Sequence, residues 1–174
     1  MLYAYNNIAP IIDTTAVIAP NATIIGNVEI GANSVVLFGA IIRAENCKIK
    51  IGEHTIIEDN VIIHGNSDIE IGNYVLIQHN SCIHGCKIQD NVLIGTNCTI
   101  SDNVLIQKGA MVLNNTVVYP EKTLKPFKKY WSVQNKLKTK FTANISSAII
   151  ERNKKHITNV IIKTKKYLAS LKAI

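Results

Sequence analysis

Aliphatic residues recur at a spacing of six along the first 124 residues of the chain. Three residues after most of these anchors stands an asparagine or a glycine, the residue types that adopt the left-handed αL conformation at least cost. A tight turn is therefore expected once per repeat, after a short extended segment. The anchors are Ile18, Ile24, Ile30, Val36, Ile42, Ile51, Ile57, Ile63, Ile71, Ile77, Ile83, Ile88, Ile94, Ile100, Ile106, Val112, Val118 and Leu124.

A strict six-residue period with one turn per repeat does not fit a helix, but it fits a parallel β-helix of short strands. Three repeats then form one coil of a triangular prism, and each coil buries its aliphatic residues against the coils on either side. Over residues 10–124 the pattern resembles that of left-handed β-helix proteins. We therefore expect an all-β fold, with a left-handed parallel β-helix domain over residues 1–124 that also carries the functional site.

The six-residue register breaks at three places, all between residues 42 and 88. Insertions near Cys47–Lys50 and Asn66–Ile69 are expected to form small corner loops, and one residue is missing between Ile83 and Ile88. Because sites on a regular scaffold tend to lie where the local rule is broken, we expect the function in this region.

The repeat ends at Leu124, and residues 125–174 are expected to form a connector followed by a C-terminal helix. Apolar residues spaced by three and four from Asn144 to Leu171 predict an amphipathic helix that lies along one face of the prism or on a neighbouring subunit.

The net charge of +7 is unevenly distributed, with 6 basic and 11 acidic residues before residue 125 and 13 basic and 1 acidic residue after it. The lysines of the second part are interspersed with apolar residues and have no aromatic stacking platform, which favours a solvated helix face over nucleic-acid binding. The longest apolar run, Val35 to Ile42, is too short to span a membrane. We expect a cytoplasmic protein, because no basic residue precedes Arg43 to start a targeting signal.

The four cysteines, Cys47, Cys82, Cys86 and Cys98, match neither a CxxC metal site nor a disulfide framework. We interpret them as small hydrophobic residues in a reducing compartment. The cluster Cys82-Ile83-His84-Gly85-Cys86 leaves a thiolate metal site open as an alternative.

Three histidines obey the repeat register. His64 and His84 each follow an anchor by one residue and are separated by one full coil, so their imidazoles are expected side by side and able to converge on one metal ion. His79 belongs to a different face of the prism and would have to come from a neighbouring subunit, which a homotrimer provides.

The same counting puts Arg43 one coil below His64 and Asp59 one coil below His79. If the histidines meet across an interface, Arg43 and Asp59 are expected to form an inter-subunit salt bridge one layer below the metal.

At these positions the chain resembles the γ-class carbonic anhydrase family. The matching segments are Arg43-Ala44-Glu45, Glu58-Asp59-Asn60, His64, and His79 to Cys86. The resemblance implies that His64, His79 and His84 bind zinc, or iron or cobalt, that Arg43 and Asp59 lie at the trimer interface, and that Glu45 lies near the metal.

The expected function is the reversible hydration of carbon dioxide to bicarbonate by a metal-bound hydroxide at the trimer interface, with Glu45 and Glu58 as candidate proton acceptors. Two alternatives stay open. One is a hexapeptide-repeat acyltransferase or thioesterase that uses coenzyme A, and the other is a non-catalytic trimer held together by zinc.

Overall fold

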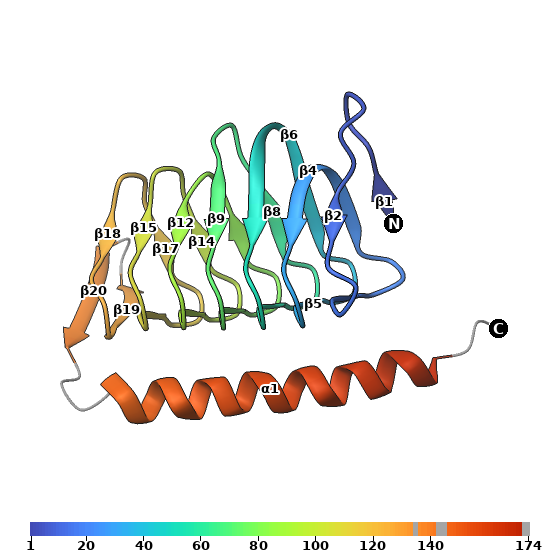
Figure 1. Ribbon diagram of the computed structural model, residues 1–174. Helices are drawn as coiled ribbons and strands as arrows, with labels where there is room; N and C mark the ends of the chain where they lie inside the picture. Colours follow the sequence, from blue (N-terminus) through green and yellow to red (C-terminus); the bar gives the residue numbers. More distant parts are fainter. Residues whose placement is uncertain (134–135, 142–145, 172–174) are drawn as a thin grey trace.

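The computed structural model describes residues 1–133, 136–141 and 146–171. Short strands wind around a common axis into a prism, and the helix α1 (Ser146–Ser170) runs along the length of that prism (Figure 1). The expected fold, a left-handed parallel β-helix with a C-terminal α-helix, is confirmed.

One face of the prism is a sheet of eight strands among the described residues. Its strands are β3 (Val17–Ile18), β5 (Val35–Val36), β7 (Ile56–Ile57), β10 (Leu76–Ile77), β13 (Leu93–Ile94), β16 (Met111–Val112), β19 (Lys128–Val133) and β20 (Lys136–Phe141). All neighbours in this sheet are parallel except β19 and β20, which form an antiparallel pair.

The other two faces belong to a second sheet, because the long strands β4 and β6 continue around a corner. Strand β6 pairs with β8 on one face and with β9 on the next. The strands of this sheet are β1 (Leu2–Tyr3), β2 (Ile11–Ile12), β4 (Thr23–Ile30), β6 (Ile41–Ile51), β8 (Ile62–His64), β9 (Ile69–Ile71), β11 (Cys82–Ile83), β12 (Lys87–Ile88), β14 (Thr99–Ile100), β15 (Leu105–Ile106), β17 (Val117–Val118) and β18 (Thr123–Leu124).

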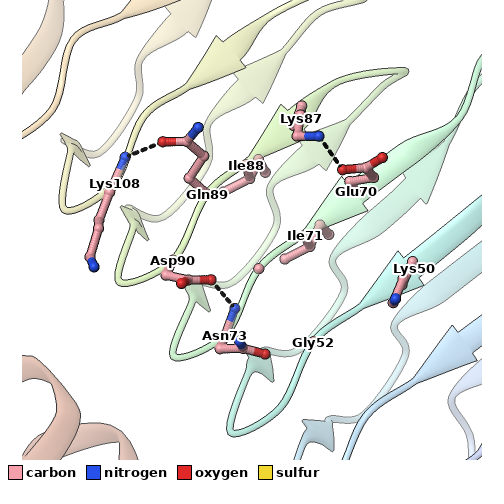
Figure 2. Close-up of a pocket in the computed structure, with 11 residues that line it drawn as sticks. Lys50, Gly52, Glu70, Ile71, Asn73, Lys87, Ile88, Gln89, Asp90 and Lys108 are labelled. Carbon is pink, nitrogen blue, oxygen red and sulfur yellow. Dashed lines mark hydrogen bonds and ion pairs between the residues drawn. The ribbon is translucent and has the colours of Figure 1, made fainter.

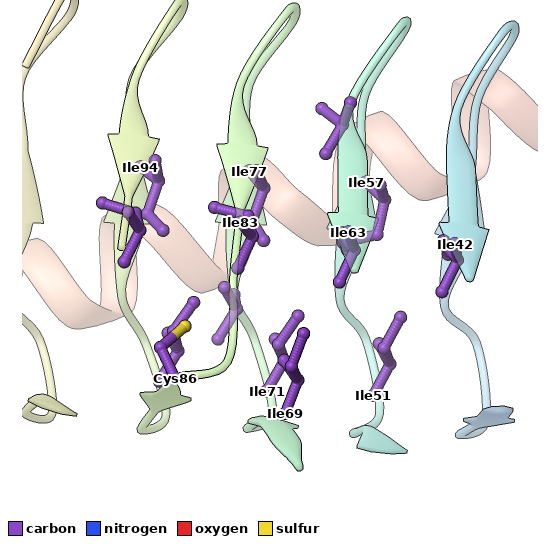
Figure 3. Packing of buried hydrophobic residues seen from close by; sticks show 14 of the residues in the cluster. Ile42, Ile51, Ile57, Ile63, Ile69, Ile71, Ile77, Ile83, Cys86 and Ile94 are labelled. Atoms are coloured by element: carbon purple, nitrogen blue, oxygen red, sulfur yellow. The ribbon is translucent and has the colours of Figure 1, made fainter. Parts of the chain in front are cut away.

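The repeat anchors form the core of the prism. Every anchor from Ile24 to Leu124 is at most 3% exposed, and the side chains of successive coils lie one above another (Figure 3). Fully burying an aliphatic side chain of this size contributes about 1.5–3 kcal/mol, so the stack is the principal stabilising feature of the fold.

The turns occur where the six-residue period places them. The third residue after an anchor has a positive φ in most repeats, including Asn33, Asn60 and Asn97. His54 and Tyr74 occupy the same position and also have a positive φ, although this conformation favours asparagine and glycine.

One expected corner loop is not a loop. The insertion near Cys47–Lys50 lies within the continuous strand β6, and the register shift falls on its neighbour β4 between Gly26 and Val28. The extra residues are therefore accommodated by a bulged pairing of two long strands.

The segment after Leu124 contains more structure than a connector. Strand β19 pairs in parallel with β16 and so extends the prism, and β20 folds back on β19. The predicted helix is confirmed as Ser146–Ser170; Asn144 and Ile145 of the predicted range lie outside the described residues.

Helix α1 packs on the eight-stranded face. Ile157 and Ile161 are buried against Val35, Ile56 and Leu76, in line with the expectation that the helix lies along one face. Among the described residues, no helix combines the length and apolar character needed to span a membrane.

The docking of α1 predicts a clear contrast between two isoleucines. Ile157→Ala is expected to lower the free energy of unfolding by about 2–5 kcal/mol, because it removes a side chain that is 2% exposed. Ile162→Ala is the matched control, because Ile162 lies on the same helix and is 50% exposed. It is expected to change the free energy of unfolding by less than about 0.5 kcal/mol. Urea unfolding of both variants measures the difference, and equal effects would contradict the packing described above.

Candidate metal centre

His64 and His84 lie side by side on the outer surface of the prism. Strands β8 and β11 pair with Ile63 opposite Ile83, and both isoleucines point into the core, so the histidines that follow them point outward. The two imidazole rings have centroids 4.5 Å apart and planes tilted by 60°. The backbone N–H of His84 donates to the carbonyl of Ile100 (2.9 Å), which fixes the chain at this point.

Cys82 joins these two histidines. One ligand atom from each of His64, Cys82 and His84 lies within 4.8 Å of the others, and Cys82 Sγ is 3.5 Å from His84 Nε2. All three side chains are half-buried. The interpretation of Cys82 as a small hydrophobic residue does not account for its place in this cluster, whereas the alternative of a thiolate metal site at Cys82–Cys86 agrees with it.

The surroundings of the cluster favour a neutral imidazole at His64. Burial lowers the pKa of His64, and the neighbouring His84 and Arg43 lower it further, while Asp102 and Glu45 oppose the shift. A neutral imidazole keeps a lone pair available for a metal ion.

Cys82 and Cys86, the two cysteines on either side of His84, have different environments. Burial raises the pKa of the half-exposed Cys82 thiol. Cys86 is buried, and desolvation together with Asp102 raises its pKa to about 12, so it stays a protonated core residue. A Cβ on Gly85, the residue between His84 and Cys86, would meet Ser67 Oγ, so a larger residue there would require the exposed Ser67 side chain to move.

His79 lies apart from this cluster and is held by two carboxylates. Its Nε2 is 3.0 Å from Glu58 Oε2, and its Nδ1 is 3.2 Å from Asp59 Oδ2. Within the described part of the chain, the group of metal-ligating side chains does not include His79. Its binding to a metal through a second copy stays a prediction.

Arg43 lies opposite His64 in the β6–β8 pairing, as the spacing predicts. Within the chain, however, its guanidinium contacts Glu45 (3.0 Å) at an exposed position. Asp59 accepts from the backbone N–H of Phe38 (3.2 Å) and contacts His79. The Arg43–Asp59 salt bridge between subunits stays a prediction.

The two candidate proton acceptors differ in environment. Glu45 is exposed and paired with Arg43. Glu58 is largely buried, and desolvation raises its pKa while the nearby His79 works in the opposite direction. Glu58 Oε2 also accepts the backbone N–H of His79 (3.2 Å).

A separate groove lies on the face formed by β9, β12 and β15. It has a volume of about 470 Å³ and is lined by charged side chains that include Lys50, Lys87 and Lys108 (Figure 2). Lys87 pairs with Glu70 (2.5 Å), and Asp90 accepts from the backbone of Asn73 (2.8 Å).

Comparison with known proteins places the chain in a family. Residues 68–102 match the family described as bacterial transferase hexapeptide (six repeats). The structure of a hexapeptide transferase family protein from Anaplasma phagocytophilum superimposes with a TM-score of 0.86 and 30% sequence identity, over 96% of this chain and 98% of that chain. The chain belongs to the hexapeptide-repeat family.

Within this hexapeptide-repeat family, the resemblance to γ-class carbonic anhydrases is confirmed by sequence similarity to proteins named gamma carbonic anhydrases. The chain is 46% identical over 57 residues to a carbonic anhydrase of Methanosarcina thermophila, covering 32% of this chain and 23% of that protein. It is 34% identical over 82 residues to a probable carbonic anhydrase of Methanocaldococcus jannaschii, covering 46% of this chain and 52% of that protein. The matched segment spans only part of these curated relatives, from 10% of a carboxysome assembly protein of Nostoc to 52% of the Methanocaldococcus protein.

The contact between the Glu58 carboxylate and the His79 ring can be tested directly. Glu58→Gln is expected to shift the nitrogen NMR signals of the His79 ring, because a neutral amide replaces the charged acceptor 3.0 Å from Nε2. Glu45→Gln is the matched control, since Glu45 contacts Arg43 instead. Unchanged His79 signals in Glu58→Gln would show that this carboxylate does not hold the ring.

Proposed function

We propose that this protein is a γ-class carbonic anhydrase-like metalloenzyme that reversibly hydrates carbon dioxide to bicarbonate. The observation that carries the proposal is the pair of outward imidazoles, His64 and His84, 4.5 Å apart on adjacent coils. Its support from sequence is the similarity of part of the chain to carbonic anhydrases.

The residues present fit a zinc ion, with iron or cobalt as alternatives. Imidazole nitrogen is a preferred zinc donor, and the donor atoms of the cluster are close enough to share one ion. A bound zinc ion supplies Lewis acidity that makes water a nucleophile near neutral pH.

The chain's own residues have separate roles in this proposal. His64 and His84 hold the metal, and His79 of a neighbouring copy is a further ligand. Glu45 and Glu58 are the proton acceptors. Glu45 is exposed and can pass a proton to solvent, whereas burial raises the pKa of Glu58 toward the range in which a general base works best.

A homotrimer is the proposed assembly. An outward column of side chains lies beside the histidines, with Ile41 opposite Ile62 in the strand pairing, both 38–39% exposed. It continues through Cys82 and Thr99 to Val117, which is 36% exposed. A second copy packed on this column would cover the apolar surface and bring another His79 near His64 and His84.

Acyl transfer with coenzyme A is the second candidate. It is favoured by the match along nearly the whole chain to a hexapeptide transferase family protein, and by the groove, in whose lining three lysines outnumber the two carboxylates of Glu70 and Asp90 and so favour an anionic ligand. Hydrolysis of a thioester, as in a thioesterase, would use the same groove. A non-catalytic trimer held by zinc would instead bind metal without either activity.

A hydration assay separates these functions. We expect the zinc-loaded protein to hydrate carbon dioxide, and His64→Ala and His84→Ala to lower kcat/KM at least about 100-fold, since losing a ligand costs more than losing an outer-shell partner. His54→Asn is the control, because His54 stacks on Tyr74 at another corner and asparagine tolerates its positive φ. Zinc binding without histidine-dependent hydration would reject the enzyme, and stabilisation by coenzyme A that survives both alanine variants would favour acyl transfer.

The trimer is tested by a charge on its proposed interface. Ile62→Asp is expected to yield monomers in sedimentation velocity, because a carboxylate would be buried against apolar side chains. Ile162→Asp is the matched control, placed on the exposed side of α1. A wild-type monomer, or a trimer that persists in Ile62→Asp, would contradict the proposed interface.

A further inference from the structure

Cys82 and His84 project from the same side of one short segment. Ile83 between them is fully buried, and because alternate side chains of a strand point to opposite sides, Cys82 and His84 both face outward. On the adjacent coil, Ile62 lies opposite Cys82, and His64 follows two residues later. Three donor side chains thus form a triangle on the surface of a single chain.

The spacing of this triangle matches metal coordination. A zinc–sulfur distance of about 2.3 Å and a zinc–nitrogen distance of about 2.0–2.1 Å at a tetrahedral angle imply a sulfur–nitrogen separation of about 3.6 Å. Cys82 Sγ lies 3.5 Å from His84 Nε2, and the full set of three ligand atoms lies within 4.8 Å. Small side-chain adjustments would bring His64 to the same ion.

The other candidate for a third donor is engaged elsewhere in the chain. Both ring nitrogens of His79 contact carboxylates, at 3.0 Å from Glu58 and 3.2 Å from Asp59. A metal ion that reaches a single chain therefore finds Cys82, and not His79, beside His64 and His84.

We propose that Cys82 is a metal ligand, which gives each chain a His64–Cys82–His84 site that takes zinc or cobalt without any residue of a second copy. On binding, the Cys82 thiol releases its proton to solvent and one metal–sulfur bond forms. In the assembled trimer, His79 of a second copy competes with Cys82 for the third position. The inference rests on the metal centre of the proposed function and does not depend on carbon dioxide hydration.

Cobalt(II) absorption tests the ligand set, because a bound thiolate gives a sulfur-to-cobalt charge-transfer band that imidazoles do not. The key variant is His79→Gln, which keeps a polar partner for Glu58 and removes the competing imidazole. We expect His79→Gln to bind one cobalt per chain and to show the band, and His79→Gln/Cys82→Ser to bind at least about tenfold more weakly and without it. Cys47→Ser in the same background is the matched control, since Cys47 is also free and half-buried, and it should keep the band.

Alkylation of the cysteines is a second test of the Cys82 ligand, and it does not depend on the cobalt absorption spectrum. Zinc should protect Cys82 from iodoacetamide in the His79→Gln protein, whereas Cys47 of the same molecule should react equally with and without zinc. Mass spectrometry of the peptides measures both sites.

The outcomes separate this inference from the proposed function. Cobalt bound to His79→Gln without the band, or zinc that leaves Cys82 fully reactive, would overturn the Cys82 ligand even if hydration is observed. A band without hydration would leave the Cys82 ligand in place and reject the carbonic anhydrase activity. Failure of the wild-type chain to bind cobalt or zinc would contradict both.

Discussion

The stacking of inward aliphatic side chains from coil to coil is the constraint on which the rest of this structure depends. A single coil has no core of its own, since its anchors are buried only by the coils on either side. The anchors from Ile24 to Leu124 are nearly all inaccessible to solvent, so a shift of one residue in any coil would expose an aliphatic side chain and bury a polar one. The hydrophobic stack thereby fixes which side chains face outward on every face.

The candidate metal centre follows from that fixed register. His64 and His84 are 20 residues apart in sequence, yet they are neighbours because Ile63 and Ile83 occupy equivalent places in the core. The scaffold supplies the spacing between coils, and the pleat of one strand supplies the spacing between Cys82 and His84. Donor atoms held in this way are placed by rigid strands and need little ordering when a metal ion binds.

The sequence predicted the features that the six-residue period controls and missed those that depend on side-chain contacts. The prism and the position of Arg43 opposite His64 in the strand register follow from the six-residue spacing, and the C-terminal helix follows from the spacing of its apolar residues by three and four. The positive φ at His54 and Tyr74 shows that position in the coil outweighs residue preference, because the packed coils on either side impose the turn. The insertion near Cys47–Lys50 was expected to form a loop, but it lies within strand β6, because the register of the pairing between β6 and β4 shifts there and takes up the extra residues. The contacts of His79 with Glu58 and Asp59 depend on side-chain conformations that no spacing rule contains.

The hairpin of β19 and β20 has a consequence for how these molecules behave at high concentration. A parallel β-helix ends in strands whose backbone groups can pair with another molecule, and repeated pairing of this kind builds fibres. At the end of the eight-stranded sheet the outermost strand, β20, runs antiparallel to its neighbour β19 and carries the exposed Lys136 and Lys138. A second copy of β20 paired on this edge would bring like charges together, which disfavours such pairing. The lysine-bearing strand at this end of the sheet therefore disfavours the addition of another prism at this edge.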